Sequence, residues 1–207
     1  MTLVVVSRNA GNQDTLVTEI RRLGGRAYAY ACDATDEGSI EALLEKVRET
    51  LDVPALVVYS LQWFAKTPSL DVSVAELEDS WRHNCLGPFL LAREAGRAMA
   101  PLGRGTIVLI GSTSSIVGRA EHLSFAVGKF GMRALAHVLA RELWPKGIHV
   151  AHLLIDADIR EGVPEDYPQS DPAHVAESIE FLHRQPRTAW TSEMDLRPWD
   201  EQFWQHC

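Results

Sequence analysis

Short β-branched apolar runs alternate with amphipathic segments along most of this chain, and this alternation limits its fold more than any other feature. The apolar runs are too short for helices and end at turn-forming residues, as buried strands do. Strands that alternate with helices predict a parallel sheet with right-handed crossovers, and therefore an α/β fold. The expected strands are Leu3–Val6, Ala27–Ala31, Ala55–Tyr59, Thr106–Ile110 and His149–Ile155, and Thr191–Arg197 is compatible with a last one. The expected helices are Asp14–Leu23, Ser39–Leu51, Val74–Met99, Phe125–Leu143 and Ala173–Arg184.

Residues 1–207 are predicted to form a single domain, because no internal repeat or low-complexity tract divides them. This length, with 46% apolar residues, is enough for one sizeable core. Pro88 predicts a kink or a boundary inside the long helix Val74–Met99. The stretch Asp156–Pro172 is rich in Asp, Glu, Pro and Gly, so we expect a mobile loop there.

The net charge of −8 argues against nucleic acid as a partner, because binding a phosphate backbone requires a positive face. No apolar run approaches the length of a membrane span, so a soluble, cytoplasmic protein with no membrane partner is expected. Cys32, Cys85 and Cys207 show no paired spacing, and the histidines form no ligand pattern, so no metal is expected. His149 and His152 alternate along a strand and are expected to pack or to hydrogen bond.

The stretch 110–133 is where we expect chemistry. It begins as the end of an apolar strand, breaks at a Ser/Thr cluster and continues as a long helix. In an α/β sheet, the crevice beyond the carboxyl ends of the strands is lined by strand-end side chains and helix starts. Ser112 is expected at the strand tip, and Lys129 is expected to project from the helix. Phe125 lies thirteen residues after Ser112 and four before Lys129.

This spacing resembles the Ser, Tyr-x-x-x-Lys signature of the short-chain dehydrogenase/reductase family, with Phe125 at the tyrosine position. The resemblance covers nearly the whole chain and implies a Rossmann-like doubly wound parallel sheet. It also implies descent from NADP(H)-dependent oxidoreductases acting on a small carbonyl or alcohol substrate. In that family the tyrosine passes a proton, the lysine lowers the pKa of the phenol and binds the nicotinamide ribose, and the serine orients the carbonyl. Ser112, Phe125 and Lys129 would be the corresponding positions.

Phe125 keeps the aromatic ring but has no proton to transfer. Loss of a positioned general acid or base costs roughly 10²–10⁴ in rate, so carbonyl reduction should be weak unless another group substitutes. Ser124 is a poor substitute, because neighbours on a helix point in different directions. Ser112, His122 and Tyr59 are better placed to substitute for the tyrosine as the proton-transferring group.

Three further positions match the family pattern. Asn84 fits the family's N-x-x-G position, where the Asn holds a proton-relay water. An Asn in the middle of a helix is mildly unfavourable, so its presence otherwise requires a structural reason such as a hydrogen-bonded kink. Arg8 fits a residue that contacts the adenosine ribose and favours a 2′-phosphate, although alone it would be a solvated turn arginine. Asp33 resembles the adenine-contacting turn, and its ordinary interpretation is a helix cap. The resemblance thus implies a weak NADP site that includes Arg8, Asp33 and Lys129.

Two departures weaken that expected cofactor site. Leu61 stands where the family has a glycine that lets the backbone approach the cofactor. The sequence also begins at the family's second strand, without the first strand, the T-G-x-x-x-G-x-G turn and the first helix. An empty central slot would leave backbone groups unpaired at ~1–3 kcal/mol each. Either the strands Leu3–Val6 and Ala55–Tyr59 pair directly, or another segment fills the gap, or the sequence is a fragment.

Three functions are compatible with these residues. The first is an NADP(H)-linked oxidoreductase that is weakened or inactive. The second is a pseudoenzyme that acts as a scaffold or regulatory partner. Homo-oligomerisation through the helices Val74–Met99 and Phe125–Leu143 is expected from the family. The third is non-redox acid/base chemistry that uses Ser112 with Lys129 or His122. The sequence favours descent from the first class, an NADP(H)-linked oxidoreductase. It does not decide whether the present protein is such an enzyme or a pseudoenzyme.

Overall fold

The computed structural model describes residues 2–160 and 169–201. The chain divides into two compact units, residues 1–53 and 54–207, and each is described by itself. The first unit contains β1 (Thr2–Ser7), α1 (Asp14–Arg22), β2 (Arg26–Ala31) and α2 (Glu37–Thr50). The second contains β3 (Leu56–Tyr59), α3 (Val74–Trp81), α4 (Gly87–Met99), β4 (Gly105–Gly111), α5 (Leu123–Leu143), β5 (Ile148–Ile155), β6 (Asp158–Ile159), β7 (Gln169–Ser170), α6 (Pro172–Arg184) and β8 (Glu193–Leu196).

In the first unit, β1 pairs with β2 in parallel from Thr2↔Arg26 to Ser7↔Ala31. Helix α2 begins at a side-chain cap, because the Asp36 carboxylate accepts the Ser39 N–H at 2.7 Å. The helix buries one apolar stripe, formed by Ile40, Leu43 and Val47. The two strands and two helices of this unit therefore confirm the pattern predicted from the apolar periodicity.

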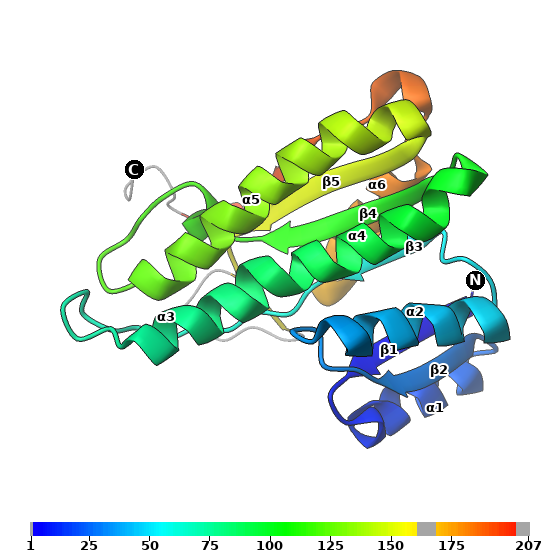
Figure 1. Cartoon of the computed structure of the whole chain (residues 1–207), viewed down its shortest axis with the longest axis horizontal. Coiled ribbons are helices and arrows are strands. Elements are labelled where there is room, and N and C mark those ends of the chain that lie inside the picture. The colour runs from blue at the N-terminus through cyan, green and yellow to red at the C-terminus, as the bar shows by residue number, and fades with distance from the viewer. Residues whose placement is uncertain (1, 161–168, 202–207) are drawn as a thin grey trace. The chain divides into compact units, whose positions relative to one another are not determined.

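In the second unit, four strands form a sheet in the order β3-β4-β5-β8, and every pairing is parallel. Helices α4 and α5 lie on one face of this sheet and α6 lies on the other (Figure 1). Strand β5 is buried along its whole length, as expected for a parallel strand that is covered on both faces. The prediction of a parallel α/β fold is confirmed.

Alternate residues of β4 and β5 point to opposite faces of the sheet. The α6 side holds the core cluster Val108, Ile110, Ala151, Leu153, Ile155, Val175 and Leu182. Because side chains alternate along a strand, His152 points to the face of β5 opposite Ala151 and Leu153. Helix α5 covers the face that carries His152 (Figure 1). No helix in the described part of the chain is long and apolar enough to cross a membrane.

The long helix expected over Val74–Met99 is interrupted by a π-helical turn, Arg82–Leu86. Pro88 lies in the first turn of α4, where its missing N–H needs no intrahelical acceptor. The boundary expected near Pro88 is therefore confirmed. The apolar pattern alone does not predict the π-helical turn that precedes it.

The loop expected over Asp156–Pro172 contains regular structure, so this prediction was wrong in part. β6 pairs in parallel with β7 through Asp158↔Gln169 and Ile159↔Ser170. Strands of two residues are too short to show an apolar period, which is why the composition suggested a loop. The rest of the expected loop, residues 161–168, lies outside the described residues.

Candidate active site

Ser112 directly follows the carboxyl end of β4. Its N–H donates to the Ser115 Oγ at 3.2 Å, and its carbonyl accepts the Ser115 N–H at 2.7 Å. These two bonds close a tight 3₁₀ turn, Thr113–Ser115, at the strand tip. The Ser112 Oγ is buried and forms no hydrogen bond with any residue in the described ranges. The strand end thus presents one hydroxyl whose hydrogen-bonding capacity is unused.

Lys129 brings the buried side of α5 to the same strand end. Its side chain is 1% exposed, and its Nζ donates to the Ile110 carbonyl at 3.0 Å, two residues before Ser112. Burial lowers the pKa of the Lys129 amine from 10.5 to about 8. The amine also lies 5.5 Å from the centroid of the Phe125 ring. Ser112, Phe125 and Lys129 are therefore gathered at the carboxyl end of β4.

The ring of Phe125 lies in an aromatic environment. It is 6% exposed and packs edge-to-face against Phe64, with ring centroids 5.1 Å apart at 80°. Phe64 in turn contacts His122, with centroids 5.3 Å apart. This segment after β3 is tied to the start of α5, because the Thr67 N–H donates to the Glu121 carbonyl at 2.9 Å. Phe125 is thus held by packing and offers no acidic hydrogen.

Asn84 lies in the π-helical turn and is completely buried. Its Nδ2 donates to the Trp63 carbonyl at 2.8 Å and to the Ser80 Oγ at 3.1 Å, while its Oδ1 accepts the Trp63 N–H at 3.3 Å. Gly128 of α5 passes close by, since a Cβ at that position would lie 2.6 Å from the Asn84 Cβ. The bonded kink expected for a mid-helix Asn is what the structure contains, and π-helical turns often lie at functional sites.

The residues considered as substitutes for the missing phenol are held by other partners. The Tyr59 hydroxyl donates to the His83 carbonyl at 2.6 Å. The Ser124 Oγ donates to the Glu76 carboxylate at 2.9 Å. The His122 Nδ1 lies 2.7 Å from the Ala120 carbonyl. Of the hydroxyls considered, that of Ser112 is the one that makes no hydrogen bond in the described chain.

Arg8 and Asp33 belong to the first unit, so the structure does not relate them to Ser112 or Lys129. They follow the ends of β1 and β2, which are in register there, and both are exposed. The Asp33 Oδ1 accepts the Thr35 N–H at 2.9 Å and the Thr35 Oγ1 at 2.7 Å, which orders the turn before α2. Asp36, not Asp33, caps the helix, so the ordinary interpretation of Asp33 was wrong in detail.

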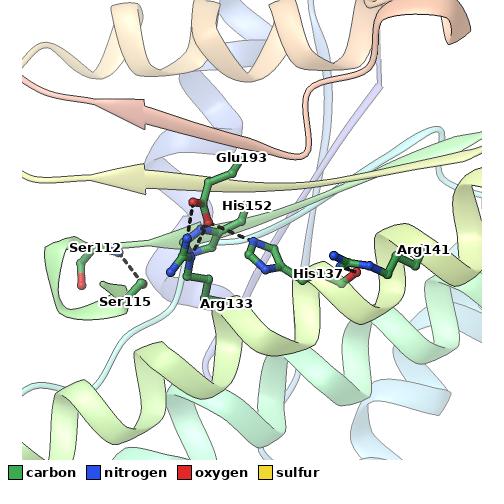
Figure 2. Close-up of polar contacts among 7 residues, drawn as sticks. All are labelled: Ser112, Ser115, Arg133, His137, Arg141, His152 and Glu193. Carbon is green, nitrogen blue, oxygen red and sulfur yellow. Dashed lines mark hydrogen bonds and ion pairs between the residues drawn. The ribbon is translucent and has the colours of Figure 1, made fainter. Parts of the chain in front are cut away.

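Sequence reasoning missed an ionic cluster on the α5 side of the sheet. Arg133 donates to both carboxylate oxygens of Glu193, at 2.7 and 2.8 Å, and His152 Nδ1 lies 3.0 Å from Glu193 Oε2. Figure 2 shows Arg133, His137 and His152 converging on this carboxylate. The Arg133 guanidinium lowers the pKa of Glu193 to about 2, and burial lowers the pKa of His152 to about 4. The expectation that His152 packs and hydrogen bonds is confirmed.

A parallel sheet with helices on both faces and polar side chains gathered beyond the end of β4 defines a Rossmann-like α/β protein. Comparison with known proteins then gives the family. The model of a family described as enoyl-(acyl carrier protein) reductase matches residues 1–177. The chain belongs to the short-chain dehydrogenase/reductase family of oxidoreductases.

The relatives differ in how much of their length they share with this chain. A D-threitol dehydrogenase of Mycolicibacterium smegmatis is 26% identical over 148 residues, which are 72% of this chain and 57% of that protein. The chain spans about half the length of the first curated relatives that it matches. A short-chain dehydrogenase from Rhodopseudomonas palustris is 34% identical, with a TM-score of 0.87 over 96% of this chain and 87% of that one. A metagenomic short-chain oxidoreductase in complex with NADP shares the fold, with a TM-score of 0.85 and 22% identity over 97% of this chain and 86% of that one.

Proposed function

We propose that this chain carries the site of an NADP(H)-dependent oxidoreductase for a small carbonyl or alcohol substrate, and that its proton transfer is weak. The observation that carries the proposal is the buried Lys129 amine, held on the Ile110 carbonyl beside the Phe125 ring at the strand end where Ser112 lies. The proposal assigns catalytic positions to Ser112, Lys129, Asn84 and Phe125, and the last of these is the defective one.

The residues present fit a nicotinamide cofactor and a substrate oxygen. The buried Ser112 hydroxyl makes no bond within the described residues, which suits a group that waits for a substrate oxygen. The Lys129 amine has three N–H groups. One donates to the Ile110 carbonyl, its acceptor in the described chain, so two remain for ribose hydroxyls. Within the first unit, taken by itself, Arg8 is exposed at the end of β1 and suits a 2′-phosphate, with Asp33 on the neighbouring turn. When bound, the cofactor would supply or accept the hydride.

Support for this chemistry also comes from the relatives. A D-threitol dehydrogenase acts on an alcohol, and a protein of the same fold binds NADP. In this chain, Ser112 would orient the substrate oxygen, and Lys129 would place positive charge near it. Phe125 cannot pass the proton, which should cost roughly 10²–10⁴ in rate, or about 3–5 kcal/mol in barrier.

A second candidate is a pseudoenzyme that acts as a scaffold or regulatory partner. The state of Asn84 favours it, because both Nδ2 donors are used to hold Trp63 and Ser80 instead of a relay water. Leu61, at the family's glycine position, also favours weak cofactor binding. Cofactor titration separates the two candidates. We expect weak binding of NADPH by fluorescence, and micromolar binding would exclude the pseudoenzyme.

The catalytic test restores the missing hydroxyl. Phe125→Tyr should raise NADPH-dependent reduction of a panel of small carbonyl compounds by at least tenfold over the natural chain. Phe181→Tyr is the matched control, because Phe181 lies on α6, is 56% exposed and should leave the rate unchanged. Equal rates for Phe125→Tyr and the natural chain would show that the phenol is not the limiting group.

The proposal includes a homo-oligomer formed through the faces of α4 and α5. Each helix exposes large apolar side chains: Phe89 on α4, and Val127, Phe130 and Val138 on α5. Apolar side chains gathered on a surface are often covered by a partner. Light scattering at micromolar concentration should give at least twice the monomer mass, and Phe130→Glu with Val138→Glu should reduce it.

A further inference from the structure

A half-exposed aromatic side chain, Phe64, lies against the ring of Phe125. The two rings pack edge-to-face, with centroids 5.1 Å apart at 80°, and the Phe64 ring also lies 5.3 Å from the ring of His122. Phe125 is 6% exposed, whereas Phe64 is 50% exposed. Phe64 therefore presents open apolar surface directly beside the position at which the family has its tyrosine.

Two backbone anchors hold the connection that carries Phe64. The Asn84 amide binds Trp63 on both sides, because its Nδ2 donates to the Trp63 carbonyl at 2.8 Å and its Oδ1 accepts the Trp63 N–H at 3.3 Å. Three residues after Phe64, the Thr67 N–H donates to the Glu121 carbonyl at 2.9 Å. Phe64 thus lies between two fixed points of a connection that has no helix and no regular strand.

Glu76, on α3, ties this connection to the start of α5. Its Oε2 accepts the Thr67 hydroxyl at 3.1 Å, and its Oε1 accepts the Ser124 hydroxyl at 2.9 Å. Ser124 directly precedes Phe125 and is 1% exposed. The two oxygens of one carboxylate therefore bind hydroxyls from both segments that bring Phe64 and Phe125 together.

The backbone of Ser124 is held as well. The Ser80 Oγ donates to the Ser124 carbonyl at 2.9 Å, and it accepts the Asn84 Nδ2 at 3.1 Å. Ser80, Asn84 and Ser124 are each at most 1% exposed. Buried polar networks whose bonds are satisfied keep their members in one arrangement. These bonds form one connected set: Trp63, Asn84, Ser80, Ser124, Glu76 and Thr67.

We propose that Glu76 is a positioning residue that holds Phe64 against the ring at position 125, and that Phe64 makes the site prefer carbonyl substrates with an aromatic group. The aromatic group packs on the open surface of Phe64, next to the reacting position. Contact between two aromatic rings is worth up to about tenfold in affinity. The substrate preference rests on the proposed function, whereas the clamp formed by Glu76 does not.

Glu76 also stabilises the start of α3, and this role must be separated from the clamp. It lies in the first turn, where negative charge is favourable, and its N–H donates to the Ser73 Oγ at 3.1 Å. Glu76→Gln removes the charge but can keep both side-chain contacts, because a hydroxyl accepts hydrogen bonds as well as donating them. Glu76→Ala removes the charge and the contacts together. The pair of variants therefore separates the two roles.

The first test follows the ring of Phe125 by NMR on the whole chain labelled at phenylalanine. The Phe64 ring shifts the Phe125 ring-proton resonances, and Phe64→Leu gives their positions without it. Glu76→Ala should move them toward the Phe64→Leu positions, whereas Glu76→Gln should leave them near those of the natural chain. Glu78→Ala is the matched control, because Glu78 is exposed on the same helix. Resonances indifferent to Glu76→Ala, or moved equally by Glu76→Gln, would overturn the clamp.

The second test measures how firmly the connection is held. Glu76→Ala should speed hydrogen exchange of the Thr67 N–H by about fivefold or more, the effect of losing one net hydrogen bond. Thr67→Val keeps the N–H but removes the hydroxyl that Glu76 accepts, so it should have a similar effect. Glu78→Ala should leave the exchange rate unchanged. If Glu76→Ala does not fold, Thr67→Val against Glu78→Ala still decides the question.

The substrate preference is tested by binding, which requires no turnover. Acetophenone, an aromatic ketone, and dihydroxyacetone, a polar ketone, are titrated into the chain and followed through the Phe125 resonances. Phe64→Ala and Glu76→Ala should each weaken the binding of acetophenone by about tenfold. The binding of dihydroxyacetone should be weaker and insensitive to both variants. Equal affinity of the natural chain and Phe64→Ala for acetophenone would overturn the preference.

The catalytic consequence is tested in the Phe125→Tyr background. There, Phe64→Ala should raise the KM for acetophenone by about tenfold and change kcat little, as expected when an interaction common to the ground state and the transition state is removed. A Phe125→Tyr variant without activity would count against the proposed function. The NMR, exchange and binding results would then still decide for or against the roles of Glu76 and Phe64.

Discussion

Replacing Lys129 with methionine should stabilise this protein at neutral pH, because the folded chain buries an amine that prefers to be charged in water. The pKa of Lys129 falls from 10.5 to about 8 on burial. The unfolded chain thus binds this proton more tightly than the folded one, and the stability of the natural protein rises as the pH rises between 8 and 10.5. At about 1.4 kcal/mol per pKa unit, burying the charge costs about 3 kcal/mol at pH 7 and about 1 kcal/mol at pH 10.

The methionine variant loses one favourable contact as well. The Lys129 Nζ donates to the Ile110 carbonyl at 3.0 Å, and the net loss of such a bond is about 1 kcal/mol. Methionine is similar in length to the lysine stem, so a cavity term is small. Lys129→Met should therefore be about 2 kcal/mol more stable than the natural protein at pH 7, and about equal to it at pH 10.

Urea unfolding at pH 7, 8, 9 and 10 measures this difference directly. Lys146→Met is the control, because Lys146 is exposed after α5 and its replacement removes no buried charge. Its difference from the natural protein should be small and independent of pH. A Lys129→Met variant that is less stable at pH 7, or whose difference does not change with pH, would show that the amine is not held in a desolvated state.

Three further results are expected from unfolding experiments. Gly111→Ala should destabilise the second unit by about 1–3 kcal/mol, since its Cβ would lie 2.0 Å from His152 Nε2. The double variant with His152→Ala should lose less stability than the two single variants lose together. The natural protein should lose up to about 3 kcal/mol of stability as the pH falls from 6.5 to 4, because His152 takes up a proton in the unfolded chain and resists it in the folded one, where its pKa is about 4. This acid sensitivity should be smaller in His152→Gln. An unchanged pH profile would refute the lowered pKa of His152. Asp36→Ala should cost about 1 kcal/mol by removing the cap bond to the Ser39 N–H, whereas a loss below about 0.3 kcal/mol would show that the cap contributes little.

The elements that could be predicted from the sequence are those with a repeating apolar pattern. Every strand of four or more residues and every α-helix of eight or more lies within or beside a predicted range, because burial on one face imposes a period on the sequence. The π-helical turn Arg82–Leu86 could not be predicted, since one inserted residue barely alters that period. The pair β6 and β7 carries no period at all.

The gathering of Ser112, Phe125 and Lys129 was predictable because all three belong to one strand–turn–helix segment. The Glu193 cluster was not, because Glu193 and His152 are 41 residues apart and meet only through the register of β5 with β8. The one signal for it in the sequence was a pair of acidic residues, Glu193 and Asp195, at alternate positions of an expected strand. Such a pattern indicates that one face of the strand is polar, but it does not predict which basic residues contact that face.

Lys129 and His152 lie on the same side of the sheet, and both are at most 1% exposed in the layer where α5 meets β4 and β5. Burial lowers the pKa of each group, so Lys129 lowers stability at neutral pH and His152 lowers it below about pH 6.5, relative to an apolar side chain of the same size. Folding alone therefore does not explain why two ionisable groups flank the end of β4. The proposed site at the strand tip accounts for both: Lys129 holds the Ile110 carbonyl from α5, and the His152 Nε2 lies beside Gly111. Under the proposed function, the residue that these two supports would position is Ser112, whether or not Phe125 leaves the site able to transfer a proton.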